Sequence, residues 1–389
     1  MWLFRSALTV LVYTGLNLYI GARIFGFVRF VLPGCKGFVF WPLYALFACS
    51  FLLVFVFRLE HIIPLRQAGM YSLAAFVYLF LTLAVSDIVR VVIRITGRAA
   101  PDPRLSALMS GAALCLTLLI LVYGAFHARD IKTRHYSLSS DKTIGVPGLR
   151  VALISDLHLG AAVGRKWTAR IVNAVNRAGP DLVCIAGDIF DGDLELVRDM
   201  EGIAAELRRI KAPLGVYACP GNHDVDRSRL NEDPTGIQRI AAFLKESGVI
   251  LLLDETASPA KRLYITGRRD ARPIGLRQPR KTIAELAPPS GPRDFLILLD
   301  HQPLEFIQAS AAGADLVLSG HTHKGQFFPG NLITRRVFKN SAGTHYGHWQ
   351  NGVTQAIVTS GAGLWGPPIR VATDSEVAVI DIRFGEAGS

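Results

Sequence analysis

Cysteine is scarce in this sequence, and no pair of cysteines has the spacing of a zinc site. Three of the five, Cys35, Cys49 and Cys115, lie in or beside long apolar runs, while Cys184 and Cys219 lie in short ones. Neither a disulfide framework nor a thiolate metal site is indicated. We expect each cysteine to be a small buried hydrophobic residue.

Excess positive charge is missing from most of the chain, although the whole sequence carries a net charge of +11. Residues 1–136 hold 13 Lys and Arg against 4 Asp and Glu, whereas residues 137–389 hold 29 against 27. The excess therefore lies beside the long apolar runs, where basic residues match lipid headgroups better than the phosphates of a duplex. A nucleic-acid partner is not indicated.

Long hydrophobic runs are abundant in the first third of the chain. Four of them, at roughly 8–27, 38–57, 70–85 and 105–126, have the length and apolarity of membrane helices. A cleaved signal peptide is the alternative for the first run because Arg5 precedes it, but no clear small-residue cleavage pattern follows. We predict a multi-pass region in the cell membrane over residues 1–136, with a three-span or re-entrant variant still open. The basic residues of the loops do not fix its orientation.

From about residue 149 the long runs give way to short apolar runs that end in Gly, Ser, Asp or His. Short runs of this kind are typical of buried strands, and a helical spacing of apolar residues between the first two ends at Gly179 and Pro180. The predicted strands lie in LRVALIS, DLVCIAG, LGVYACPG, FLILLDH, ADLVLSGH and QAIVTSGAG. We therefore predict an α/β domain over residues 137–389.

Metal-binding residue types follow five of these predicted strands. They are Asp156 and His158, then Asp188 and Asp191, then Asn222, His223 and Asp224, then His301, and last His321 and His323. A single Asp after a strand usually caps a helix or makes a turn. Ligands of α/β sheets collect at the carboxyl ends of strands, so the whole series predicts one shared metal site. Carboxylate, amide and imidazole ligands without thiolate favour Mn²⁺, Fe²⁺/³⁺ or Zn²⁺.

The ordered series DxH, GDxxDG, GNHD, a lone His and GHTH resembles the calcineurin-like metallophosphoesterase superfamily over residues 149–384. GHTH followed by KGQFFPG, and the later TSGAGLWGPPIRV, are similar to its membrane-associated bacterial members. The resemblance implies a four-layer α/β/β/α sandwich that holds two divalent metal ions. We expect this sandwich to follow an all-α transmembrane region of about four helices.

The resemblance also implies a role for each residue of the series. The first metal would be bound by Asp156, His158 and His323, the second by Asn222, His301 and His321, and both by Asp188.

The catalytic role that the resemblance implies falls on His223, which would contact the scissile phosphate or protonate the leaving group. Asp191 and Asp224 would orient His or Asn side chains, with a plain turn as the alternative for Asp191. His345 and His348 could line the substrate pocket without binding metal. His61, His127 and His135 are expected at the membrane interface.

Two parts of the sequence depart from the pattern or stand outside it. Lys324 follows GHTH where close relatives commonly have Gly, and it would bind a substrate phosphate or point into solvent. Residues 261–281 form a solvated loop or a cap drawn to anionic groups. That segment concentrates Arg268, Arg269, Arg272, Arg277 and Arg280.

The predicted function is that of a membrane-anchored, metal-dependent phosphoesterase, in which a metal-bridging hydroxide attacks the phosphorus atom. Membrane attachment favours a lipid-linked or membrane-proximal substrate, such as a phospholipid or glycolipid headgroup, and leaves monoester and diester open. The alternative is a membrane sensor or transport component regulated by its phosphoesterase domain. Polar residues in the predicted spans are few and mild, which favours an anchor; they are Asn17, Ser50, Ser72, Thr82 and Thr117.

Overall fold

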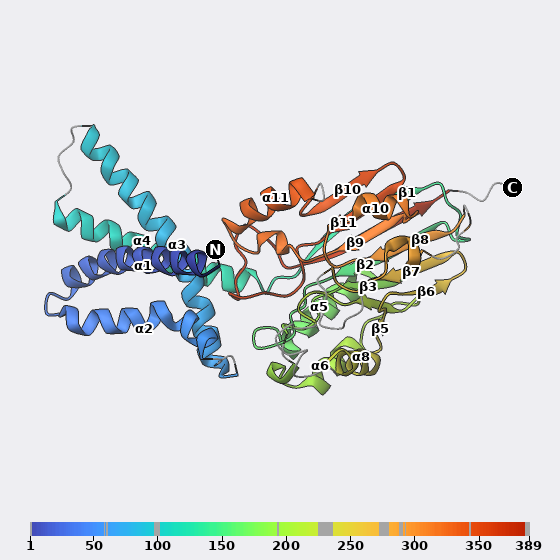
Figure 1. Cartoon of the computed structure of the whole chain (residues 1–389), viewed down its shortest axis with the longest axis horizontal. Coiled ribbons are helices and arrows are strands. Elements are labelled where there is room, and N and C mark those ends of the chain that lie inside the picture. Colours follow the sequence, from blue (N-terminus) through green and yellow to red (C-terminus); the bar gives the residue numbers. More distant parts are fainter. Residues whose placement is uncertain are drawn as a thin grey trace. The chain divides into compact units, whose positions relative to one another are not determined.

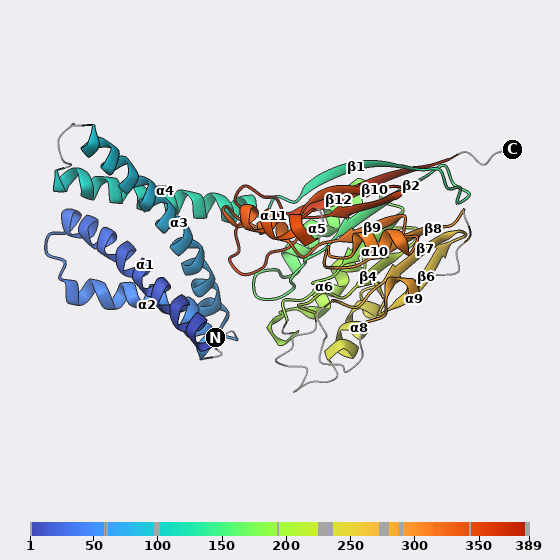
Figure 2. The same cartoon turned by 45° about the horizontal axis from the view of Figure 1, so that its top comes forward.

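The computed structural model describes residues 2–57, 59, 61–96, 102–192, 194–224, 236–271, 280–287, 291, 293–341 and 344–385. Contacts divide the chain into two compact units, both drawn in Figures 1 and 2. The first unit comprises residues 1–126 and 366–368, and the second comprises 127–365 and 369–389. The predicted boundary after residue 136 differs from this division because residues 132–140 form a strand of the second unit.

The first unit is built from helices. Among the described residues these are α1 (Trp2–Val31), α2 (Gly37–Val56), α3 (Ile63–Ile95) and α4 (Pro103–His127). Each contains a segment long and apolar enough to cross a membrane, and these segments are Leu8–Val31, Gly37–Val54, Ile63–Ile95 and Pro103–His127. Four candidate spans therefore stand where the sequence predicts four.

The third helix is about twice as long as the predicted run 70–85. Asp87 lies inside it, and two arginines pair with its carboxylate at 2.8 Å, Arg23 from α1 and Arg90 from the next turn of α3. Tyr19 of α1 also donates a hydrogen bond to Asp87 at 2.7 Å. Because these charges are paired between helices, a carboxylate that ends the apolar run in the sequence does not end the helix.

The cysteines, all of which lie in the described part of the chain, are free thiols. Cys184 and Cys219 are buried in strands as predicted. For Cys49 and Cys115 the prediction of burial is wrong, because both are exposed on the long apolar helices.

The second unit contains two mixed sheets of six strands each within the described residues. The first has the order β1 (Lys132–Ser140), β12 (Glu376–Phe384), β2 (Gly148–Ile154), β3 (Leu182–Ala186), β4 (Val216–Cys219) and β5 (Ile250–Leu251). The second has the order β10 (Gly347–Asn351), β11 (Thr354–Val358), β9 (Leu316–Ser319), β8 (Phe295–Leu299), β7 (Leu263–Gly267) and β6 (Glu255–Ala260). The six predicted strands correspond to β2, β3, β4, β8, β9 and β11.

The sheets pack face to face, and helices cover their outer faces, so the predicted four-layer α/β/β/α order is present (Figures 1 and 2). Leu153 and Cys184 of the first sheet share a buried core with Ile297 and Leu318 of the second. Helices α5 (Arg165–Ala178), α6 (Met200–Leu207) and α8 (Gly236–Glu246) pack on the first sheet. Helices α9 (Ile283–Leu286) and α10 (Phe306–Ala311) pack on the second.

Strand direction brings the polar strand ends together. Strands β2, β3 and β4 are mutually parallel, as are β8 and β9, so each set ends at one edge of its sheet, here called the carboxyl edge. Strand β12 is antiparallel to β2 and parallel to β1, so both begin at this edge. The chain thus leaves α4 at His127 and enters the sandwich at the carboxyl edge.

Candidate metal centre

All seven predicted metal ligands lie in loops at the carboxyl edge. Asp156 and His158 follow β2, Asp188 follows β3, and Asn222 follows β4. From the second sheet, His301 follows β8, and His321 and His323 follow β9. Two three-residue groups within this set have ligand atoms within 4.8 Å of one another: Asp156, His158 and His323, and Asp188, His301 and His321. The centre is therefore shared between the two sheets.

The first group is buried and has its nitrogen and oxygen atoms turned toward one point. His158 Nε2 and His323 Nε2 are 3.0 Å apart, and His323 Nε2 lies 3.4 Å from Asp156 Oδ1. Two imidazole nitrogens can approach in this way through one shared proton or through a cation between them. The group therefore has the donor atoms and the convergence of a cation site.

Asp188, a member of the second group, also faces the first. Its Oδ2 is 3.7 Å from His158 Nε2 in the first group and 3.1 Å from His301 Nε2 in the second. The rings of His301 and His321 are 5.1 Å apart, centroid to centroid. Asp188 Oδ1 also accepts a hydrogen bond of 2.7 Å from the backbone of His223, which fixes the carboxylate.

The backbone of the centre is strained. Five of the seven predicted ligands have positive φ angles between 47° and 71°, a region that costs energy for residues other than glycine; they are Asp156, His158, Asp188, His321 and His323. Gly187 shows why the loops cannot relax, because a Cβ at this residue would lie 2.7 Å from the ring of His301. Strain concentrated in this way is typical of functional sites.

The residues fit a bound divalent cation on two counts. Asn222 Oδ1 is buried and has no hydrogen-bond partner among the described residues, which is costly unless a ligand satisfies it. Burial disfavours charge on His301, yet the adjacent Asp188 raises the pKa of that imidazole well above its usual value. Burial by itself would raise the pKa of Asp188, but the charges of His301, His158 and His223 hold that pKa below its usual range. The pocket therefore favours a positive charge.

His223 lies at the open side of this cluster. Its side chain is 30 % exposed, its ring packs edge-on against His158 at 5.0 Å, and its Nδ1 is 4.0 Å from Asp191 Oδ1. Asp191 Oδ1 also lies 3.4 Å from His158 Nδ1, so this aspartate faces two histidines. Burial lowers the pKa of His223.

Asp224 contacts the backbone instead of an imidazole or amide side chain. Its carboxylate accepts hydrogen bonds from the backbone N–H groups of Phe190 at 2.8 Å and Gly221 at 2.7 Å. It therefore ties the loop after β3 to the loop after β4, and the predicted contact with His or Asn side chains is replaced by this backbone role.

Arg370 is a contributor that the sequence analysis did not single out. Its side chain is fully buried and donates hydrogen bonds to the carbonyls of His323, Ser360, Gly361 and Gly363. Burial lowers its pKa to about 10, which leaves the guanidinium charged at neutral pH. Arg370 lies in the segment GPPIRV, which indicates a family resemblance in the sequence but no role for the arginine.

Lys324 and three histidines without a predicted metal role contact other residues of the chain. Lys324 is partly exposed, and its Nζ lies 4.0 Å from the centre of the Tyr346 ring, a cation–π contact. His345 is half-buried, and its carbonyl accepts a hydrogen bond of 2.6 Å from Thr322 Oγ1 of GHTH. His348 is exposed on β10, where its ring lies 3.0 Å from Gln355. His127, which was predicted at the membrane interface, contacts Asp374, with 3.0 Å between Nε2 and Oδ1.

The prediction of a loop or cap over residues 261–281 is wrong for Leu263–Gly267, which form the buried strand β7. Arg272 and Arg277 lie outside the described residues. Arg268 is 2 % exposed and donates hydrogen bonds to Asp300 at 2.7 Å and Glu305 at 2.8 Å, and Arg280 pairs with the same two carboxylates. For Arg268 the prediction of a solvated or cap residue is wrong. Its side chain is buried and pairs with Asp300, the residue that precedes His301.

Replacing Arg268 by Ala should lower the free energy of unfolding by about 3–5 kcal/mol, because the buried Asp300 carboxylate loses its closest partner. Arg209→Ala is the matched control: its pair with Glu206 is half-exposed, so about 0–1 kcal/mol is expected. Thermal unfolding followed by circular dichroism measures both. Equal, small shifts for the two variants would contradict a supporting role for Arg268.

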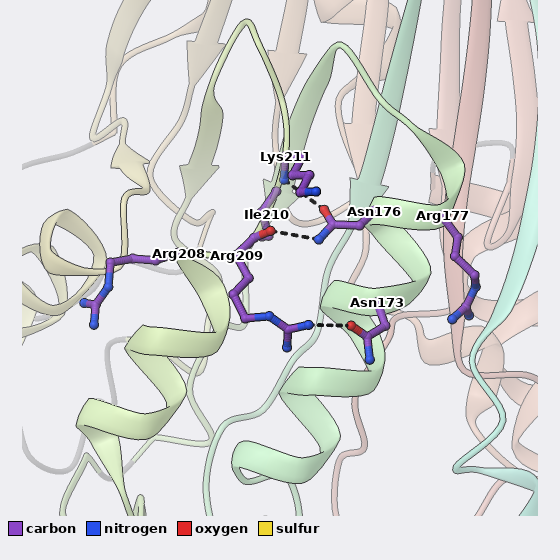
Figure 3. A pocket seen from close by; sticks show the side chains of 7 residues that line it. All are labelled: Asn173, Asn176, Arg177, Arg208, Arg209, Ile210 and Lys211. Carbon is purple, nitrogen blue, oxygen red and sulfur yellow. Dashed lines mark hydrogen bonds between the residues drawn. The ribbon is translucent and has the colours of Figure 1, made fainter.

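A separate cavity of about 660 Å³ lies away from the metal centre, where α5 and α6 end (Figure 3). Its lining donates and accepts hydrogen bonds within itself, from Arg209 to Asn173 at 3.0 Å and from Asn176 to the Arg209 carbonyl at 2.8 Å. Arg177 and Arg208 point away to either side. This cavity is lined by cationic side chains, and the residues that line it include no His, Cys, Asp or Glu.

Sequence comparisons relate this chain to metallophosphoesterases. Residues 149–325 match the model of the calcineurin-like phosphoesterase family. An uncharacterized metallophosphoesterase of Campylobacter jejuni is 25 % identical over 98 % of this chain and 99 % of its own length. A transmembrane protein with metallophosphoesterase domain from Danio rerio is 32 % identical over 70 % of this chain, which spans 62 % of that relative.

Among solved structures, the 5'-nucleotidase precursor from Thermus thermophilus aligns over 61 % of this chain and 54 % of its own, at 15 % identity and a TM-score of 0.34. The family match covers the loops of Asp156, Asp188, Asn222, His301 and His323, and it ends just after GHTH. Residues 149–325 of this chain are therefore similar to the calcineurin-like phosphoesterase family.

Proposed function

We propose that this protein is a membrane-anchored, metal-dependent hydrolase of phosphate esters. The observation that carries the proposal is the convergence of carboxylate and imidazole groups from five strand ends. In this reading helices α1 to α4 form the membrane region, and the sandwich that begins with β1 at Lys132 is the catalytic domain. A metallophosphoesterase domain combined with a transmembrane protein, as in the Danio rerio relative, supports this pairing.

The proposed centre holds two divalent ions. Asp156, His158 and His323 would bind the first ion, Asn222, His301 and His321 the second, and Asp188 both. Two such ions supply positive charge for the phosphate oxygens and lower the pKa of a bound water toward neutrality. The ligand set is compatible with manganese, iron or zinc.

The residues of the chain have distinct tasks in this proposal. Asp188 holds both halves of the centre at one spacing because its carboxylate faces both groups. His223, which is 30 % exposed beside the cluster, contacts the scissile phosphate or gives a proton to the leaving oxygen. Asp191 orients His158 and His223, and Arg370 fixes the backbone of His323.

The proposed substrate is a lipid-linked or membrane-proximal phosphate ester, such as a phospholipid or glycolipid headgroup. The support is positional: a candidate span ends at His127, and the first strand of the sandwich begins at Lys132. A phosphodiester and a phosphomonoester both fit this chemistry.

A regulatory role is the second candidate, and one feature of the helices favours it. Asp87, Arg23 and Arg90 form an ion cluster between α1 and α3, and charged groups inside candidate spans often mark function. In that case the phosphoesterase domain would control the helices.

The full-length protein in detergent should hydrolyse an aryl phosphodiester or an aryl phosphomonoester when Mn²⁺ is added, and lose this activity when metals are chelated. Re-adding Mn²⁺, Fe²⁺ or Zn²⁺ separately ranks the metals, and the preferred ester separates diesterase from monoesterase. Absence of turnover, together with absence of bound metal by mass spectrometry, would favour the regulatory role.

A further inference from the structure

Helix α11 (Gly330–Ser341) begins directly after the loop that carries His321 and His323. Its first turn is locked to that loop, because Gly325 has φ 77° and a Cβ there would lie 2.2 Å from the backbone nitrogen of Asn331. The Phe338 ring packs edge-on against His321 at 5.9 Å. One face of α11 is therefore part of the wall of the metal centre.

The side of α11 away from this contact is exposed and carries both apolar and basic residues. Leu332, Ile333 and Val337 are 54 %, 62 % and 57 % exposed, and the exposed Arg335 and Arg336 lie among them. A single exposed Leu is ordinary on a protein surface. Three large apolar side chains with basic neighbours on one helix are instead the composition of a helix that lies in a membrane interface.

An exposed aromatic residue, Trp365, is joined to the segment just before this helix. Trp365 is 51 % exposed, and its backbone exchanges two hydrogen bonds with the Gln326 side chain, four residues before α11. The indole also packs against His223 at 6.1 Å. Trp side chains are enriched at the depth of lipid headgroups.

A cationic cavity of about 680 Å³ lies at the same carboxyl edge, where α5 and α6 begin. Its cationic lining residues are Arg129, Arg165, Lys166, Arg170 and Arg198. Within the described part of the chain, Lys166 and Arg170 form no ion pair. Arg129 follows the end of a candidate membrane span by two residues, so these charges belong to the region where the chain leaves the bilayer in the proposed function.

Charge alone would not identify the membrane-facing edge, because the cavity of Figure 3 at the other ends of α5 and α6 is also cationic. Its single apolar lining residue, Ile210, is half-buried. The carboxyl edge differs in combining cations with the exposed apolar residues of α11.

We propose that α11 is an interfacial helix. Its exposed residues Leu332, Ile333 and Val337 lie in the headgroup region of an anionic bilayer. The metal centre then faces the phosphate esters of lipids. The substrate class in this inference rests on the proposed function, whereas the docking of α11 rests on its exposed residues and their charge. A protein partner fits less well, because a stable interface buries about 800 Å² on each side and needs shape complementarity over the whole area. A bilayer needs neither.

The test places an environment-sensitive NBD fluorophore at Ile333→Cys in the full-length protein in nanodiscs that contain anionic lipid. The background replaces Cys35, Cys49 and Cys115 by Ala, while Cys184 and Cys219 stay, because both are buried and burial raises the pKa of their thiols. Val353→Cys is the matched control: this residue is 80 % exposed in the turn between β10 and β11, at the edge opposite the metal centre.

We expect blue-shifted emission at position 333, with quenching by headgroup-labelled lipid, and water-like emission at position 353. Nanodiscs of neutral lipid should give a smaller shift at 333 because the basic residues lose their counter-charge. Equal, water-like emission at both positions would overturn the proposal. So would a blue shift that lipid quenchers do not affect, or one that disappears when each nanodisc holds one protein, since these outcomes place a protein on α11.

Kinetics supply a second measurement. Replacing Leu332, Ile333 and Val337 together by Ser should lower the ratio of lipid-ester to soluble aryl-ester hydrolysis by about tenfold, because the site loses its hold at the interface. Val353→Ser should leave this ratio unchanged. An unchanged ratio in the triple variant would refute the link between α11 and a lipid substrate. The fluorescence readout needs no turnover, so docking and the proposed hydrolase activity can fail separately.

Discussion

Asp188→Asn should lower the hydrolysis of an aryl phosphate ester by about a thousandfold, because a charge contribution of several kcal/mol is lost from both halves of the centre. The replacement keeps the shape of the side chain and an oxygen that can accept the backbone hydrogen bond from His223. It removes the negative charge that faces His158 and His301. The effect therefore reports on charge and metal binding more than on folding.

Asp191→Asn is the matched comparison, because Asp191 faces His158 and His223 but is not a proposed bridging ligand. Loss of an orienting carboxylate costs about 10–100-fold in activity or metal affinity. Turnover at saturating Mn²⁺ and metal content by mass spectrometry are measured for both variants. If Asp188→Asn retains both metals, or loses no more activity than Asp191→Asn, Asp188 does not hold the centre together.

The sequence predicts the layers of the sandwich because buried strands leave a local signal. Runs such as Leu182–Ala186 are apolar throughout, and their ends carry the polar residues that a carboxyl edge gathers. Helix α5 is equally legible, since its apolar spacing ends at Gly179 with φ 58°. Strand β1 was not predicted because its exposed residues alternate weakly, and only its pairing with β12 makes it part of a sheet.

Features that depend on distant partners could not be predicted from the sequence. Arg268 and Arg280 look like solvated charges until Asp300 and Glu305, at least twenty residues away, are seen to pair with them. Arg370 looks like any arginine after two prolines, although it binds four carbonyls of the site. In each case the chemistry of the residue is ordinary, and its role comes from what the fold places beside it.

Loop strain was likewise invisible in the sequence. Nothing in DLH or GHTH says that Asp156 or His323 adopts a positive φ, because that conformation is imposed by packing between the two sheets. The motifs therefore identify which side chains gather at the carboxyl edge. They do not give the directions in which those side chains point, which the loops set.

His223→Gln should reduce hydrolysis of an alkyl phosphate ester by about 10²–10⁴-fold, the range for loss of a general acid. An alkoxide is a poor leaving group and needs a proton as the bond to phosphorus breaks. His223 is placed for this task, since its ring is partly exposed beside the cluster and Asp191 lies 4.0 Å from Nδ1. Gln keeps a hydrogen-bond donor at this position but cannot transfer a proton at neutral pH.

The leaving group separates the two roles proposed for His223. The phenolate of an aryl ester with an acidic phenol leaves without protonation. If His223 is purely a general acid, His223→Gln should therefore lower the hydrolysis of that substrate by no more than about tenfold. A histidine that contacts the scissile phosphate predicts equal losses for alkyl and aryl esters, because both transition states carry the same phosphoryl oxygens. Metal content serves as the control: if His223→Gln loses metal, then His223 belongs with His158 and Asp191 as a ligand.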